Sequence, residues 1–141
     1  MHKQKAGDTK VELKRNRNSV YQIGYHVVWC TKYRKSILQG KIVDFLKEMF
    51  SKIANDNNFV IEKMEIMPDH VHLFVSASPN ILIADMLKSL KGVSARLLFK
   101  KHPEIKKQLY GGHLWNPSYY VGTVGQISED AVKRYIEEQK K

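Results

Sequence analysis

The chain has 141 residues, of which 43% are hydrophobic and 27% are charged. This length and composition are typical of a single globular domain and exclude a wholly disordered chain. Lysine and arginine total 24 against 14 aspartates and glutamates, which gives a formal net charge of +10. A small protein this basic most often binds a polyanion, with nucleic acid as the leading class. An anionic membrane surface is the alternative, which no basic amphipathic terminal helix supports.

The sequence carries no sign of secretion or of a membrane span. Cys30 is the single cysteine, which excludes an internal disulfide, and a lone thiol suits a reducing compartment. The first ten residues, MHKQKAGDTK, lack the apolar run of a signal peptide. No apolar stretch approaches the roughly 20 residues that a membrane span needs. We therefore expect a cytoplasmic protein without a membrane partner.

The N-terminal part is predicted to contain an arm, a strand and a helix. Residues 1–18 are polar and basic, so we predict a flexible arm, followed by a single domain over residues 19–141. Tyr21–Cys30 alternates with period two, which predicts a strand with one buried face. Over Lys41–Ala54 apolar residues recur at helical spacing, and the polar run Asn55–Asn58 ends this helix.

The middle of the chain is predicted to form two strands and a second helix. Phe59–Met67 and His70–Ala77 are joined at Pro68-Asp69, a short turn that favours antiparallel pairing. Ser78-Pro79-Asn80 precedes the helix, whose apolar face consists of Ile83, Met86, Leu87, Leu90, Val93 and Leu97. Three basic residues are expected on the other side of this helix, namely Lys88, Lys91 and Arg96.

A further strand is predicted after the second helix. A short helical segment at Pro103–Tyr110 ends where Gly111-Gly112 breaks the chain. Leu114–Val124 is aromatic and β-branched and therefore predicts a strand. Pro117 favours an edge or a bulge for this strand, because proline has no N–H to donate.

The C-terminal region is predicted to be a helix on a glycine-containing linker. Gly122 and Gly125 suggest a hinge, although such glycines can equally end a strand. Ser128 is a favourable N-cap for a helix that runs to about Lys140. The order strand, helix, strand, strand, helix, strand, helix predicts an α+β fold, a ferredoxin-like or RRM-like antiparallel sheet with packed helices.

Two histidines on the third predicted strand are the first candidate functional residues. Because strand side chains alternate, Val71 and Leu73 face one way, and His70 and His72 face the other, about 7 Å apart. Two imidazoles at this spacing can bind one divalent ion. Two ligands do not complete a metal site, however, so two partly exposed histidines on a sheet surface are the alternative interpretation.

Tyr135 and Gln139 on the final predicted helix are the second candidate pair. A separation of four residues places both on one helical face, beside Val132 and Ile136. Taken alone, the pattern favours an amphipathic tyrosine that covers the core and a solvated glutamine.

Together, the two pairs resemble a known family. Two histidines separated by one hydrophobic residue, with Tyr-x-x-x-Gln on a late helix, are the signature of HUH nucleases with one tyrosine. The chain is more closely similar to the small single-strand DNA transposases of prokaryotic insertion sequences (TnpA-type tyrosine transposases). The similarity spans about Tyr21–Gln139 without departure from the core motif. The segments that carry it are Tyr25–Arg34, Met67–Leu73, Leu114–Thr123 and Arg134–Gln139.

The resemblance implies a role for each candidate residue. His70 and His72 are expected to bind a divalent ion, with the amide oxygen of Gln139 as third ligand, and mixed nitrogen and oxygen ligands suit Mg²⁺ or Mn²⁺. Tyr135 is expected to attack a phosphodiester of single-stranded DNA, giving a 5′-phosphotyrosyl enzyme and a free 3′-hydroxyl. No nucleotide cofactor is expected, because exchange of phosphate esters roughly conserves bond energy and no Walker-type or G-x-G-x-x-G motif is present.

The resemblance also implies a homodimer and a substrate of DNA hairpins at the ends of the element. Docking of the tyrosine helix on its own chain or on a partner stays open. Candidate contacts to DNA phosphates, which are more often simply solvated, are Lys32, Arg34, Lys35, Lys88, Lys91 and Arg96. Aromatic residues that either stack on unpaired bases or lie in the core are Tyr33, Trp115, Tyr119 and Tyr120. Histidines that either adjoin the site or are structural are His26 and His113.

Two other functions compete with transposition. A host-domesticated relative that cuts repeated palindromic hairpins, without mobilising its own element, shares the same chemistry. A non-catalytic ferredoxin-like protein that binds single-stranded nucleic acid needs only the basic and aromatic surface. A non-catalytic binder would not explain why the two histidines occur together with the tyrosine and the glutamine, so their joint presence would be a coincidence.

Overall fold

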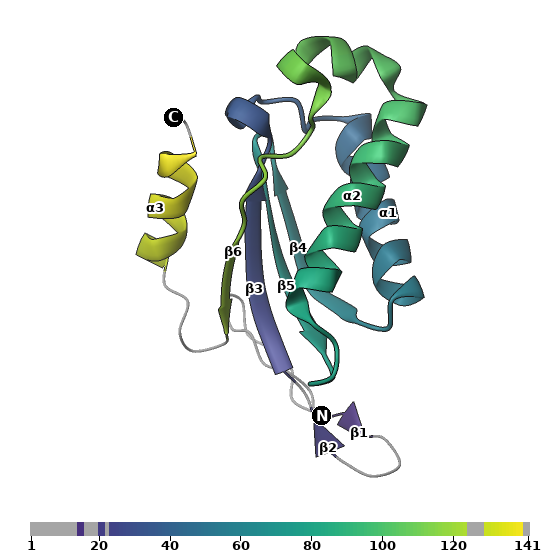
Figure 1. The fold of residues 1–141 in the computed structure, drawn as a ribbon, viewed down its shortest axis with the longest axis vertical. Helices are drawn as coiled ribbons and strands as arrows, with labels where there is room; N and C mark the ends of the chain where they lie inside the picture. Colours follow the sequence, from purple (N-terminus) through teal and green to yellow (C-terminus); the bar gives the residue numbers. More distant parts are fainter. Residues whose placement is uncertain (1–13, 16–19, 22, 124–128, 140–141) are drawn as a thin grey trace.

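A four-stranded antiparallel sheet forms the centre of the computed structural model, which describes residues 14–15, 20–21, 23–123 and 129–139 (Figure 1). Its strands, in the spatial order β4-β5-β3-β6, are β3 (Ile23–Cys30), β4 (Val60–Met67), β5 (His70–Ala77) and β6 (Tyr120–Thr123). The helices are α1 (Lys41–Asp56), α2 (Ile83–Lys101) and α3 (Glu129–Glu138). The order of strands and helices along the chain, with antiparallel neighbours throughout the sheet, confirms the predicted α+β fold.

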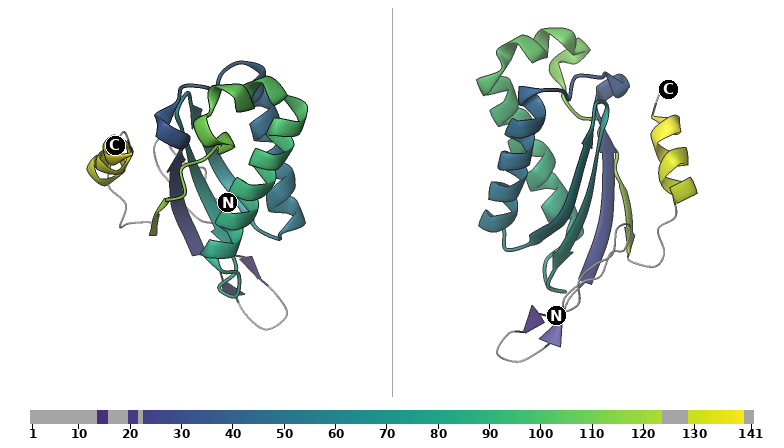
Figure 2. Two further views of the ribbon diagram at one scale, coloured as in Figure 1. Left: turned by 45° about the horizontal axis from the view of Figure 1, so that its top comes forward. Right: turned by 180° about the vertical axis from the view of Figure 1, so that it is seen from behind.

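The helices α1 and α2 pack against each other and cover one face of the sheet (Figure 2). Trp29 of β3 is fully buried there, and its ring meets the rings of Phe50 and Trp115 edge-on, with centroids 5.7 Å apart in each pair. This packing confirms the period-two prediction for β3 and the amphipathic prediction for α1. On α2, the structure adds Leu98, fully buried, to the predicted apolar face. No helix among the described residues is both long and apolar enough to cross a membrane.

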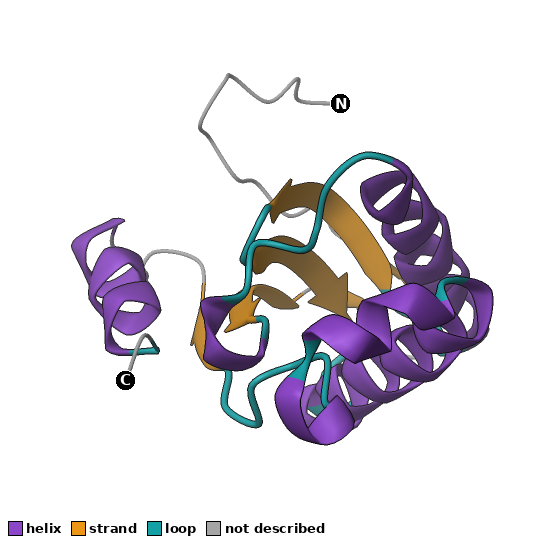
Figure 3. Ribbon diagram, turned by 90° about the horizontal axis from the view of Figure 1, so that it is seen from above, coloured by secondary structure: helices purple, strands orange, loops and turns teal. Residues whose placement is uncertain are grey.

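The opposite face of the sheet is also partly covered. Val28 and Cys30 alternate with Trp29 and therefore face away from α1 and α2, yet both are fully buried. The helix α3 contacts β3, and a view from above shows it on the opposite side of the sheet from α1 and α2 (Figure 3). The prediction of one buried face for this strand was therefore incomplete, because α3 packs on its second face.

Two predicted elements differ in extent from those observed. The strand predicted over Leu114–Val124 is shorter, since only Tyr120–Thr123 pairs with β3 and an isolated bridge joins Trp115 to Thr31. Gly122 pairs with His26 inside β6. Three predictions at the linker, the strand end Val124, the hinge residue Gly125 and the N-cap Ser128, lie outside the described residues.

The described residues before β3 and the segment after α2 differ in detail from the prediction. Tyr21, predicted to begin the strand, lies instead in β2 (Val20–Tyr21), which pairs with β1 (Lys14–Arg15). The predicted division at residue 18 between arm and domain stays a prediction. The predicted helical segment after α2 is a 3₁₀ helix, η2 (Pro103–Gln108), followed by η3 (Tyr110–Gly112), in which both glycines have positive φ.

We expect Val71→Ala to lower the free energy of unfolding by about 2–3 kcal/mol, because the valine is fully buried at the centre of the sheet. The matched control is Val60→Ala on the edge strand β4, where the side chain is 41% exposed and the expected change is within about 0.5 kcal/mol. Urea unfolding of both variants measures the difference. Equal effects would contradict the assignment of Val71 to the core.

Candidate active site

The histidine pair lies on an interior strand of the sheet. β5 is flanked by β4 and β3, and within the β3 pairing His70 is opposite Cys30 and His72 is opposite Val28. Both imidazoles are partly exposed, with 19% and 27% of their side-chain surface open, on the face opposite the buried Val71. The predicted shared face is confirmed, and its place inside the sheet fixes the backbone of both residues.

His70 is oriented by its neighbour in the β4–β5 turn. Its Nδ1 lies 2.8 Å from Oδ1 of Asp69, and the other carboxylate oxygen accepts a hydrogen bond of 2.9 Å from Nε of Arg34. Burial by itself raises the pKa of Asp69, but the hydrogen bonds from His70 and Arg34 outweigh burial and hold this pKa below its usual range. A carboxylate on one ring nitrogen leaves Nε2 of His70 available to a ligand.

His72 has its own ring contacts. Its Nε2 lies 3.2 Å from Nδ1 of the buried His26, and its Nδ1 lies 3.8 Å from a carboxylate oxygen of Glu65. Burial lowers the pKa of both His26 and His72, and the nearby carboxylate of Glu65 opposes this change only in part. Both imidazoles are therefore neutral at neutral pH, which is the form that binds metal ions. The sequence named His26 as a candidate for the surroundings of the site, and the structure places it there.

Tyr135 and Gln139 meet at one hydroxyl group. The Tyr135 hydroxyl lies 2.9 Å from Oγ of Ser118, which lies 3.0 Å from Oε1 of Gln139 and 3.1 Å from Oδ1 of Asn116. Oγ of Ser118 therefore links the Tyr135 hydroxyl to the amide oxygens of Gln139 and Asn116. The predicted common face of Tyr135 and Gln139 is confirmed, although Gln139 directly follows α3 rather than belonging to it.

The surroundings of the Tyr135 ring keep its hydroxyl protonated. Burial raises the pKa of Tyr135, and the hydrogen bond with Ser118 opposes this change only in part. The ring of Tyr120 on β6 lies 6.0 Å away between centroids. The phenol consequently needs a chemical environment other than the observed one to become a nucleophile at neutral pH.

The loop that carries Ser118 is anchored by Lys91 of α2. The ammonium group of Lys91 donates to the backbone oxygens of Asn116 (2.8 Å) and Ser118 (3.0 Å). Burial under this loop lowers the pKa of Lys91 to about 8. The sequence placed Lys91 on a charged, outward side of the helix; that placement is wrong, because the loop before β6 covers the ammonium group.

The two pairs lie on the same face of the sheet, but the histidines belong to β5, whereas Tyr135 belongs to α3 and Gln139 directly follows it. The Ser118 loop leads into β6, the histidines lie on β5, and β3 runs between them. The two strand spacings from β5 across β3 to β6 correspond to about 10 Å. Among the described residues, no three His, Cys, Asp or Glu side chains form a metal-binding cluster.

The remaining sequence candidates lie in varied environments. In η1 (Lys32–Arg34), Tyr33 is 52% exposed, whereas the Arg34 side chain is largely enclosed at Asp69. Trp115 belongs to the core, and its Nε1 donates to the backbone oxygen of Lys91. Candidates whose side chains are exposed are Lys35, Lys88, Arg96, His113 and Tyr119.

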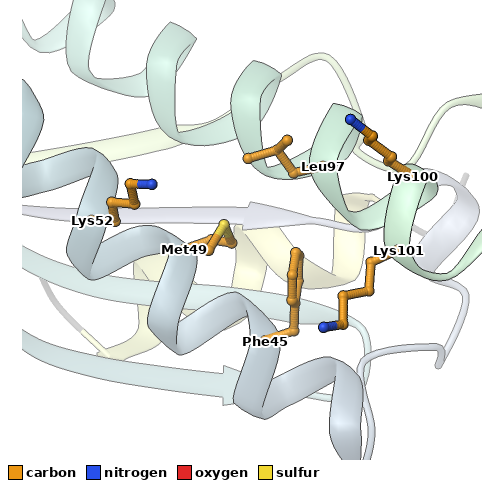
Figure 4. Close-up of a pocket in the computed structure, with 6 residues that line it drawn as sticks. All are labelled: Phe45, Met49, Lys52, Leu97, Lys100 and Lys101. Carbon is orange, nitrogen blue, oxygen red and sulfur yellow. The ribbon is translucent and has the colours of Figure 1, made fainter.

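A separate groove of about 410 Å³ lies in the helical layer. Figure 4 shows the side chains that line it, contributed by α1 and α2, and they are Phe45, Met49, Lys52, Leu97, Lys100 and Lys101. Because α1 and α2 cover the other face of the sheet, the groove is not part of the histidine and tyrosine site.

We expect the Cys30 thiol to be unreactive in the folded protein. It is fully buried, and burial raises its pKa to about 11, so the reactive thiolate is scarce at neutral pH. Alkylation followed by mass spectrometry should show no modification of the native protein within an hour or so and complete single modification in urea. Rapid alkylation of the native chain would contradict the burial of this strand beneath α3.

One family model and two known relatives match most of the chain. Residues 19–139 match the family described as "Transposase IS200 like". The ISDra2 transposase TnpA of Deinococcus radiodurans is 46% identical over 129 residues, which cover 92% of each chain. The transposase for insertion sequence element IS200 of Salmonella typhimurium is 28% identical over 119 residues, 82% of this chain and 78% of that protein.

Solved structures agree with these matches. A chain from Deinococcus radiodurans R1, crystallised as a transposase candidate, is 43% identical and superposes with a TM-score of 0.84 over 89% of this chain and 97% of its own. A REP-associated tyrosine transposase bound to a REP hairpin is 14% identical, with a TM-score of 0.56 over 86% and 67%, and shares the fold alone. The family match and the 46% identical relative show that the chain belongs to the IS200-like transposase family.

Proposed function

We propose that this transposase cleaves and rejoins single-stranded DNA at insertion-sequence ends, with Tyr135 as nucleophile and a divalent metal ion as cofactor. Membership of the family makes the chain a DNA-cleaving, strand-transferring enzyme of transposition. The observation that carries the finer proposal is the placement of a tyrosine hydroxyl and a histidine pair on the same face of one sheet.

The donor set of the proposed metal site fits Mg²⁺ or Mn²⁺. His70 offers Nε2, because its other ring nitrogen faces Asp69, and His72 is kept neutral by burial. Gln139 offers an amide oxygen at the same face as Tyr135. These three donors are uncharged, so they leave the charge of a bound ion available to a phosphate. When bound, the ion polarises the non-bridging oxygens of the phosphate and stabilises the developing charge.

In the proposed reaction, the Tyr135 hydroxyl exchanges its hydrogen bond with Ser118 for a bond to a DNA phosphate. To attack, its hydroxyl leaves Ser118, to which it is hydrogen-bonded in this structure, and approaches the phosphorus atom. A bond then forms between the phenol oxygen and phosphorus while the bond from phosphorus to the 3′ oxygen breaks. The phenol loses its proton, and the departing 3′ oxygen takes up a proton to become the free 3′-hydroxyl. Attack by a 3′-hydroxyl on the phosphotyrosine reverses the step, so rejoining requires no nucleotide cofactor.

The proposed substrate is single-stranded DNA with hairpins at the element ends, bound by a homodimer. The net charge of +10 supports a nucleic-acid partner. The relative at 46% identity is a transposase, and the relative at 28% is the transposase for an insertion sequence element, which favours transposition over a domesticated hairpin nuclease. A non-catalytic binder would not need a tyrosine hydroxyl and a glutamine amide that meet at one serine hydroxyl.

Covalent capture tests the proposal. The protein is incubated with single-stranded DNA that carries a candidate end hairpin, in Mg²⁺ or Mn²⁺, and separated on a denaturing gel. We expect a protein–DNA adduct that chelator prevents, and peptide mapping should find the DNA on Tyr135. Absence of an adduct with either metal, despite measurable DNA binding, would overturn the catalytic proposal in favour of the binding protein.

A further inference from the structure

The corner after β3 has an uncommon backbone conformation. Tyr33 and Arg34 are consecutive non-glycine residues with φ of 58° and 52°, both in the left-handed region. Side chains with a Cβ are strained there, and two such residues in succession persist only where surrounding contacts hold them. The contacts at this corner therefore indicate what the strained geometry achieves.

The corner directs Arg34 onto Asp69. The guanidinium lies largely enclosed, with 16% of the side chain exposed, and its Nε donates to Oδ2 of Asp69 at 2.9 Å. Its Nη1 is buried and has no hydrogen-bond partner among the described residues. In an exposed arginine, water could satisfy every N–H group. Here one N–H group contacts a carboxylate oxygen while the buried Nη1 lacks a partner, which costs free energy.

Asp69 is held on its backbone side as well. Its carbonyl oxygen accepts from the backbone N–H of Thr31 at 3.0 Å and from the Thr31 hydroxyl at 3.3 Å. The preceding carbonyl, of Pro68, accepts from the N–H of Leu38 at 2.9 Å. With the backbone and one carboxylate oxygen fixed, the other oxygen has a defined position, 2.8 Å from Nδ1 of His70.

We propose that Arg34 and Asp69 are positioning residues for His70, and that they fix its ring with the proton on Nδ1 and the lone pair on Nε2. A carboxylate only accepts hydrogen bonds, so its contact with Nδ1 selects this tautomer. Arg34 in turn fixes the rotation of the carboxylate. The inference rests on the proposed function, in which Nε2 of His70 binds the metal ion. It reassigns Arg34, a sequence candidate for phosphate binding, to the support of the site.

The substitution Asp69→Asn tests the proposal because it reverses one hydrogen bond and keeps the other. Arg34 only donates, so the asparagine oxygen remains on Arg34 and its NH₂ group faces His70. An NH₂ group needs an acceptor, which moves the ring proton from Nδ1 to Nε2. We expect Mn²⁺ affinity, measured by calorimetry on the metal-free protein, to fall by about 10–100-fold.

Two further variants separate the effect of the His70 tautomer from loss of negative charge and from rotation of the Asp69 carboxylate. Glu65→Gln removes one negative charge beside His72, on a half-exposed carboxylate 3.8 Å away, and should change Mn²⁺ affinity by less than about threefold. Arg34→Met leaves Asp69 in place without its anchor, and we expect a smaller loss of affinity than for Asp69→Asn. Equal losses in Glu65→Gln and Asp69→Asn would assign the effect to charge and overturn the proposal.

The tautomer of the unsubstituted protein gives a readout that depends on neither a variant nor activity. Nitrogen-15 NMR of the metal-free protein at about pH 8, where an ordinary histidine is neutral, should show His70 with its proton on Nδ1. A proton on Nε2 would overturn the inference even if Asp69→Asn did not fold. If His70→Ala binds Mn²⁺ as well as the unsubstituted protein does, the proposed metal site fails instead, whatever the tautomer.

Discussion

Tyr135→Phe is expected to abolish the covalent adduct and to lower strand cleavage by at least about 1000-fold, while hairpin binding remains within about threefold. The substitution removes only the hydroxyl, so the ring contact with Tyr120 and the packing of α3 on β3 are retained. Denaturing gels with end-labelled DNA measure cleavage, and fluorescence anisotropy measures binding.

The matched control for this prediction is Tyr25→Phe. Tyr25 is a partly buried tyrosine of β3 that packs against the core, on the face opposite the histidines. Loss of its hydroxyl should leave the adduct intact. If Tyr135→Phe still forms an adduct at the rate of the unsubstituted protein, another residue is the nucleophile and the proposed chemistry is wrong.

Replacing both His70 and His72 by alanine is expected to eliminate Mn²⁺ binding and to lower cleavage by at least about 1000-fold, as chelation should in the unsubstituted protein. Neutral imidazoles are the only nitrogen ligands that the proposed site has, and the amide of Gln139 alone is a weak ligand. The fold should tolerate the change, since both side chains are partly exposed and Val71 keeps its place in the core.

The control for the histidine prediction is His102→Gln. His102 ends α2, where its ring contacts Phe45 in the helical layer, across the sheet from the proposed site. Calorimetry with Mn²⁺ and cleavage assays should show values close to those of the unsubstituted protein. Cleavage that survives in the double alanine variant would exclude a histidine-bound metal from the reaction.

Local patterns predicted the elements that form the sheet and the helical layer. The alternation over β5 and the helical spacing over α1 depend on neighbours in the sequence, and both boundaries agree with the structure to within two residues. The packing of α3 on the second face of β3 was not predictable in this way. α3 lies far from β3 in the sequence, and a local pattern does not show which strand a distant helix contacts. The shortened β6 has a similar cause, since the turn at Asn116 and Ser118 interrupts a run rich in β-forming residues.

Within the site, the motif residues were predicted and their supports were not. A repeating pattern placed His70 beside His72 and Tyr135 beside Gln139, but Ser118 lies in a loop, where no periodicity marks a partner. Arg34 was assigned to phosphate because charge alone does not identify which anion a guanidinium binds. The signal available for Asp69 was its position directly before a candidate metal-binding histidine, where a carboxylate can reach the ring.

The helix α3 has two roles, one in the reaction and one in the fold, and a truncation that removes it removes both. Besides carrying Tyr135, it packs on β3, the strand on which Val28 and Cys30 are buried. We expect a gene cut short before this helix to yield a product that lacks its reactive phenol and also displays a bare apolar strand, which promotes aggregation. Such a product would be cleared rather than persist as a folded competitor at element ends. Decay of the gene from its 3′ end would thus silence the element without producing an inhibitor of its intact copies.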